Sequence, residues 1–235
     1  MNDWFEFKDV SSEAVGLVVT EMPEVIIPEE RVTFTAVPGR SGSLSQREGV
    51  DVFNDIILPF KCFCADPADS LENGLRAFLR GSGALRYPVR PDGYYQATVI
   101  NQVELQKILR GHSARDFVVN FRCSPLFRLD EGEEPVSVTS GTFLENPTDI
   151  KARPLITITG SGDITLIVGT QIVELTDIED GISLDCEMQE AYWDGELLND
   201  HMSGDFPLLG TGSTAISWSG GTVTQVVVTP RWVDR

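Results

Sequence analysis

Apolar runs recur at near-regular spacing through the second half of this chain, and glycine-rich turns separate them. The runs alternate apolar with polar residues or are rich in β-branched ones, and they begin at Leu155, Ile164, Ile182, Ile216 and Val223. Alternation places every second side chain on the same face of a strand. We expect Gly160-Ser161-Gly162 to be one of the turns. Residues 136–235 should therefore form a self-contained β-sandwich.

The first half also predicts strands. A proline inside one apolar run, at Pro59, suggests an edge strand or a bulge. Pro91-Asp92-Gly93 lies between two apolar runs and predicts the turn of a hairpin. The expected strands cover residues 15–20, 31–37, 55–64, 85–89, 94–100, 99–109 and 116–123.

Residues 66–81 predict the only convincing helix. Asp66 is a suitable N-cap, and Pro67 suits the first helical position. One apolar face follows helical spacing and consists of Leu71, Leu75, Phe78 and Leu79. Gly81 is expected to end the helix. A single helix packed against a sheet is the consequence.

Residues 125–135 break the strand pattern with an acidic, glycine-containing run, which we interpret as a linker. The expected domains are therefore 1–135, with its helix near 67–80, and 136–235. The 21 Gly and 13 Pro favour a turn-rich β architecture. The predicted fold class is all-β with one short helix, in two domains.

The formal net charge is −18, and both halves are acidic. A chain with this charge is not expected to bind nucleic acid or an anionic membrane through long-range attraction. No apolar stretch approaches the roughly 20 residues of a membrane span, and no signal peptide is visible. We therefore expect synthesis in a cytoplasm and no insertion into a membrane.

Nothing in the sequence matches a known catalytic or metal-binding motif. The four cysteines lack the spacing of a zinc site and are expected to be buried free thiols. Asp177, Glu179 and Asp180 precede Gly181 but lack the spacing of a calcium loop, so they predict a solvated acidic turn. A glycosidase would need two carboxylates over a cleft, for which the candidates are Asp163, Asp185, Glu187, Asp194 and Glu196. Acidic residues are common everywhere in this chain, so we expect no enzyme, no metal and no cofactor.

Sugar binding is the alternative that the residues leave open. Aromatic side chains on a β-sandwich can stack on a sugar ring, and the candidates are Tyr192, Trp193, Trp218 and Trp232. Trp218 and Trp232 stand at positions typical of core or edge packing. The alternative function is therefore a lectin-like module.

Several short motifs follow one another in a defined order along nearly the whole chain. The first is the loop Pro38-Gly39-Arg40-Ser41-Gly42, and the helix and the linker follow it. The last are Gly204-Asp205-Phe206-Pro207, Trp218-Ser219-Gly220 and Pro230-Arg231-Trp232. In this order the motifs resemble those of siphophage distal tail proteins, the hub at the tip of a long non-contractile phage tail.

This resemblance implies a structural virion protein at the phage tail tip. In the family, an N-terminal β-sandwich-like domain closes a hexameric ring, and a galectin-like C-terminal β-sandwich projects outward. The implied partners are the tail tube protein, the tape measure protein and the tail-associated lysin, tail fibre or receptor-binding proteins. DNA would pass through the ring without specific binding. The expected assembly interface consists of Pro38, Gly39, Arg40, Gly42, Asp92, Gly93 and Tyr94.

Overall fold

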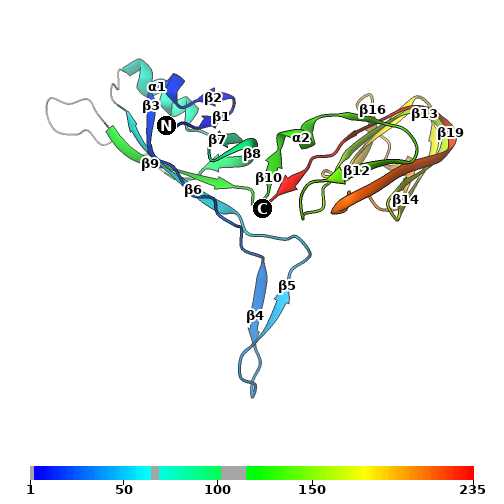
Figure 1. Ribbon diagram of the computed structural model, residues 1–235, viewed down its shortest axis with the longest axis horizontal. Coiled ribbons are helices and arrows are strands. Elements are labelled where there is room, and N and C mark those ends of the chain that lie inside the picture. Colours follow the sequence, from blue (N-terminus) through cyan, green and yellow to red (C-terminus); the bar gives the residue numbers. More distant parts are fainter. Residues whose placement is uncertain (1–2, 65–68, 102–114) are drawn as a thin grey trace. The chain divides into compact units, whose positions relative to one another are not determined.

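The structure is a computed structural model that describes residues 3–64, 69–101 and 115–235. Its contacts divide the chain into two compact units, residues 1–127 with Arg235, and residues 128–234. We call them unit 1 and unit 2 and describe each by itself (Figure 1). Strands dominate both units, so the predicted all-β fold class is confirmed.

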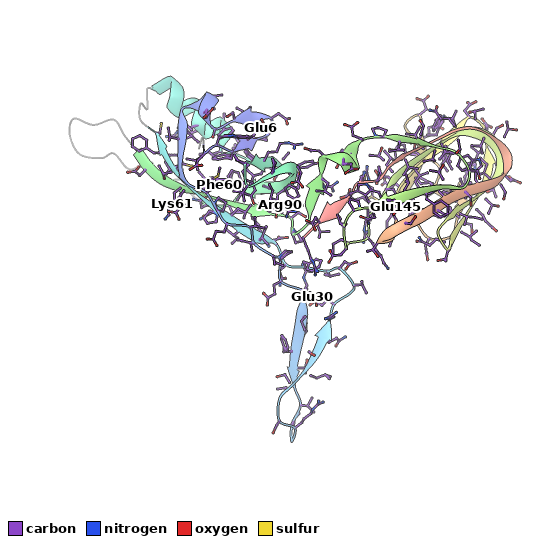
Figure 2. The ribbon with its side chains drawn as sticks, viewed as in Figure 1. Glu6, Glu30, Phe60, Lys61, Arg90 and Glu145 are labelled. Carbon is purple, nitrogen blue, oxygen red and sulfur yellow. The ribbon has the colours of Figure 1, made fainter. Side chains whose placement is uncertain are left out.

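Unit 1 is built on an antiparallel sheet in the order β2–β1–β7–β8–β9–β6–β3. Phe5 and Phe60 pack on one side of it with ring centroids 4.9 Å apart, and Phe121 lies 5.4 Å from Phe5. All three rings are fully buried, and Figure 2 marks Phe60. The strands are β1 (Glu6–Phe7), β2 (Val10–Ser11), β3 (Leu17–Glu21), β6 (Ile56–Cys64), β7 (Ser82–Tyr87), β8 (Arg90–Val99) and β9 (Arg115–Cys123).

The predicted helix is confirmed as α1 (Asp69–Phe78), and a short 3-10 helix, η1 (Glu13–Val15), contacts it. Leu75 and Phe78 are buried, as their spacing predicts, and Phe78 stacks on Phe5 at 5.8 Å. The expected caps at 66 and 67 lie outside the described residues. Lys8 reaches the other end, where its Nζ donates to the carbonyl oxygen of Arg80 at 2.7 Å. A cation at this end satisfies carbonyls that the helix leaves unpaired.

One prediction about unit 1 was wrong in detail. The β7–β8 hairpin exists, but it turns at Pro88 and Val89, and Pro91-Asp92-Gly93 lies within β8 beside a register shift.

The prediction of an edge or a bulge at Pro59 holds locally. β6 as a whole pairs with both β9 and β3, but its pairing with β3 ends at Lys61 and includes a register shift. Pro59 therefore pairs with β9 alone, which is the kind of position that tolerates a proline in a strand.

Unit 2 is a β-sandwich wound from two long strands, β13 (Leu155–Val168) and β19 (Gly212–Thr229). They pair along their length, and both faces of the sandwich share them (Figure 1). One set of partners is β11 (Val136–Val138), β15 (Gly181–Asp185), β16 (Glu190–Trp193) and β17 (Glu196–Leu197). The other set is β12 (Thr142–Asn146), β14 (Gln171–Ile178) and β18 (Met202–Ser203).

The expected turn at Gly160-Ser161-Gly162 is absent, because β13 continues through these residues without reversing direction. The register against β19 shifts there instead, between Thr159 and Gly160 and again after Ser161. A Cβ on Gly160 would lie 2.3 Å from the carbonyl oxygen of Thr222, so only glycine permits this approach of the two backbones. The glycines mark a bend between the two halves of the sandwich.

The acidic run at 125–135 is ordered, with β10 (Phe127–Leu129) followed by the short helix α2 (Asp130–Glu133). This second helix was not predicted. β20 (Val233–Asp234) pairs with β10, and the carbonyl oxygen of Gly132 accepts a bond of 2.6 Å from the N–H of Arg231.

All four cysteines lie in the described residues, where they are buried and unbridged, as predicted. Burial raises the pKa of the Cys62 thiol to about 12. The thiol is therefore protonated and unreactive at neutral pH.

Candidate assembly interface

A β-hairpin made of β4 (Val32–Ala36) and β5 (Ser43–Arg47) forms a two-stranded sheet of its own in unit 1. The five register pairs run from Val32 with Arg47 to Ala36 with Ser43. Every residue from 33 to 50 is exposed. An isolated two-stranded hairpin is at best marginally stable in water, so this element is one that a partner surface would stabilise.

The hairpin carries exposed apolar side chains that contribute to no core in the described structure. Phe34 is 70% exposed and Leu44 is 49% exposed. Phe34 lies opposite Ser45, on one face, and Leu44 lies opposite Thr35, on the other. The hairpin therefore presents one large exposed apolar side chain on each of its faces.

Its tip is the predicted loop, and the structure explains both of its glycines. Gly39 and Gly42 have φ angles of +78° and +81°, and nothing lies within 4 Å of a Cβ added to either. These positions need glycine for their left-handed backbone, not for close packing. Between them Arg40 is exposed, and it is the only charged residue from Val32 to Gln46. A near-neutral, basic-tipped hairpin thus belongs to a chain of net charge −18.

The base of the hairpin is held firmly. Arg31 donates its N–H to the carbonyl oxygen of Val52 at 2.9 Å, and its carbonyl oxygen accepts from Glu48 at 3.1 Å. Arg47 pairs with Glu30 at 3.1 Å, at the point marked by Glu30 in Figure 2. Phe53 is buried beside this ladder. The β4–β5 hairpin is therefore fixed at its base by these bonds and exposed to solvent along its length.

The structure places the second group of expected interface residues within β8. Gly93 is buried, and its carbonyl oxygen accepts a bond of 3.2 Å from Nη1 of Arg86. The guanidinium of Arg86 also lies over the Tyr94 ring, 5.0 Å from its centroid. Asp92 is exposed. Gly93 and Tyr94 are thus engaged inside unit 1, and the structure does not bring them together with the hairpin tip.

Sequence reasoning missed three exposed apolar side chains on the outer face of the unit 1 sheet, where the strand register sets them among charged residues such as Lys61 and Arg122. Val18 on β3, Ile57 on β6 and Val118 on β9 are 53%, 50% and 39% exposed. β3 also forms one end of the sheet order, so one edge of it is unpaired in the described structure. The alternation in 56–64 could have indicated the outward direction of Ile57, because positions 57, 59, 61 and 63 of the strand share the outer face.

The carboxylates considered for catalysis are mostly engaged. Asp185 forms a two-point ion pair with Arg231, at 2.8 and 3.0 Å, and Glu187 binds Arg128. Oδ1 of Asp163 accepts the N–H of Asp177 at 3.0 Å. Asp194 and Glu196 lie apart from these, in a hollow described below.

The aromatic residues considered for sugar binding also differ in their surroundings, because two pack in or on the core and one lines the hollow. Trp232 is 4% exposed and belongs to the core, and Trp218 packs against that core. Tyr192 is half-buried on β16, and Trp193 lines the hollow. Among the residues described, no three His, Cys, Asp or Glu side chains are placed to hold a metal ion, and no helix could cross a membrane.

The fold is that of a phage baseplate hub protein. Over 96% of this chain and 97% of the other, it superposes on the Dit protein (gp 19.1) of phage SPP1 with a TM-score of 0.76 at 11% identity. That protein is described as a paradigm of the hub adsorption apparatus in phages that infect Gram-positive bacteria. A chain of the phage p2 baseplate in its activated, strontium-bound conformation matches at 0.51, with 8% identity over 96% of this chain and 97% of that chain. No family model and no curated protein matches the sequence.

The resemblance to distal tail proteins that the sequence suggests is therefore confirmed by the fold. It extends over both units, because nearly all of each chain is covered.

Proposed function

We propose that this chain is the structural hub at the distal end of a long phage tail, where six copies close into a ring. The observation that carries the proposal is the likeness to SPP1 Dit across both units. The ring would join the tail tube and tape measure proteins to the lysin, fibre or receptor-binding proteins at the tip. Unit 1 would form the ring, and unit 2 would be the galectin-like domain that projects from it.

The hairpin supports this assembly. A ring needs a head-to-tail contact, in which one surface of a copy meets a different surface of the next. The exposed β4–β5 hairpin and the open edge of β3, which carries the exposed Val18, are two such different surfaces. Arg40 at the tip would be attracted to its acidic neighbour and would offset a small part of the repulsion between copies of net charge −18.

The test is native mass across a concentration series, with electron microscopy of the largest species. The wild-type chain should form six-fold rings with an open centre. Phe34→Asp should reduce the fraction of rings strongly, because it places a charge in an apolar contact. Arg40→Glu should do so by reversing the charge at the tip.

Lys151→Glu is the matched control, since it makes the same change of charge at an exposed position in unit 2. Circular dichroism should show all variants folded. Rings that survive both hairpin variants would refute the role of the hairpin. A wild-type chain that stays monomeric even with its tube protein present would refute the hub.

A further inference from the structure

A hollow of about 460 Å³ opens in unit 2 where the β14–β15 turn, the β16–β17 hairpin and the 3-10 helix η2 (Asn199–His201) meet. We call it the Trp193 pocket, and its lining includes Glu179, Asp180, Gly181, Trp193, Glu196 and His201. Its volume lies within the range of about 300–1,000 Å³ for sites that bind small molecules. The turn that the sequence predicts to be merely solvated forms one wall of it.

The indole ring of Trp193 packs against Gly181. A Cβ on Gly181 would lie 2.5 Å from Cη2 of Trp193 and 2.7 Å from the carbonyl oxygen of Ile158, so the ring lies directly against the backbone of β15. Trp193 is half-buried, and its register partner across the β16–β17 hairpin is Glu196. Directly paired residues project on the same face, so a carboxylate stands beside the aromatic ring.

His201 is oriented by a single hydrogen bond. Its Nδ1 lies 2.9 Å from the carbonyl oxygen of Thr176, which can only accept, so Nδ1 carries the proton. His201 therefore lines the pocket with its ring held in one orientation.

The side chains that line the pocket favour a ligand that is positively charged and rich in hydrogen-bond donors. Five lining residues are Asp or Glu, and none is Lys or Arg. Carboxylates only accept hydrogen bonds, so an anionic ligand is repelled and a ligand with few donors leaves them unsatisfied. The Trp193 ring adds an apolar face that also attracts cations.

We propose that the Trp193 pocket binds a saccharide ring that carries a protonated amine. The ring would stack on Trp193, its hydroxyls would donate to the carboxylates, and the ammonium would lie near Glu196. The flat apolar face of the Trp193 indole is the kind of surface on which a saccharide ring stacks. The site is independent of the hub proposal, because ring assembly is measured separately.

The test titrates the full chain with glucosamine and follows the bound state by saturation-transfer NMR, which suits weak ligands and large assemblies. Glucosamine should bind at least about tenfold more tightly than glucose or N-acetylglucosamine, a factor that one favourable charge interaction supplies. Trp193→Ala should abolish the binding and Trp193→Phe should retain part of it. Glu196→Gln should weaken it severalfold.

Glu145→Gln is the matched control, since Glu145 is exposed on β12 and does not line the pocket (Figure 2). It should leave the affinity for glucosamine unchanged. Equal binding of glucose would overturn the requirement for a cation. Cadaverine binding as tightly as glucosamine would overturn the saccharide and assign the pocket to a lysine side chain. No saturable binding of glucosamine would overturn the site.

Discussion

Asp185 and Arg231 form the most buried ion pair that the structure describes in unit 2, with side chains 6% and 18% exposed. Burial alone would raise the pKa of the Asp185 carboxyl. The hydrogen bonds from Arg231 and from the N–H groups of Met188 and Glu187 outweigh it, so the pKa lies below its usual value. Arg231 also holds a φ of +56°, a strained conformation for a side chain of this size. The pair therefore fixes the C-terminal segment against the end of β15.

Replacing Asp185 by Asn should destabilise unit 2 by about 3 kcal/mol, because it leaves the guanidinium partly buried without its counter-ion. Urea unfolding of the variant against the wild type measures the loss. Glu190→Gln, a neighbouring but half-buried position on β16, serves as the control and should change stability little.

The same pair gives a defined dependence on pH. The folded pKa of Asp185 is below its unfolded value, so its stabilisation is present above about pH 4 and is lost as pH falls through the folded value. The difference in unfolding free energy between wild type and Asp185→Asn should therefore shrink as the pH is lowered from 5 to 2. A difference that stays constant would show that the carboxylate charge is not the source.

At the scale of elements, two glycines in regular structure have opposite roles. Gly160 lies where β13 and β19 approach closely, whereas nothing surrounds a Cβ added to Gly74 in α1. Gly160→Ala should cost about 2 kcal/mol or more by forcing the strands apart. Gly74→Ala should stabilise by up to about 1 kcal/mol through helix propensity. Thermal unfolding of both variants should show shifts in opposite directions. A neutral Gly160→Ala would mean that the bend relaxes freely.

Sequence reasoning found elements whose pattern is local and misplaced those whose meaning depends on a distant strand. The spacing of Leu75 and Phe78 is sufficient for α1, because one helix face repeats every 3.6 residues. Gly160 resembles a turn residue because the same glycine also suits a close backbone approach, which only the register against β19 reveals. The turn at Pro88 was missed because Pro91-Asp92-Gly93 carries a stronger turn signal.

The candidate sites follow the same rule. The hairpin tip at Gly39 and Arg40 could be singled out because its glycines and its charge are adjacent in the sequence. The Trp193 pocket could not, since Asp180, Trp193 and His201 come from three segments that meet only when the sandwich has folded.

At the scale of the whole molecule, the charge predicts the nature of the ring that we propose. Each copy carries −18, so the wall of a central channel should be acidic. Such a wall repels phosphate and leaves DNA free to pass. Electron microscopy of the assembled ring at side-chain resolution tests this directly. A channel lined with Lys and Arg would contradict it.

The charge also decides how assembly should respond to salt. Copies of net charge −18 repel one another, and this repulsion involves far more charge than the attraction to Arg40. Raising the ionic strength from 0.01 to 0.1 M shortens the screening length from about 30 to about 10 Å, so it weakens the long-range repulsion first. Apolar contacts by Phe34 and Leu44 are not screened.

Sedimentation of the wild type should therefore show a larger fraction of rings as the salt concentration rises. Arg40→Glu should need more salt than the wild type to reach the same fraction of rings. Rings that dissociate as salt rises would instead mean that close ion pairs, and not the apolar side chains of the hairpin, hold the copies together.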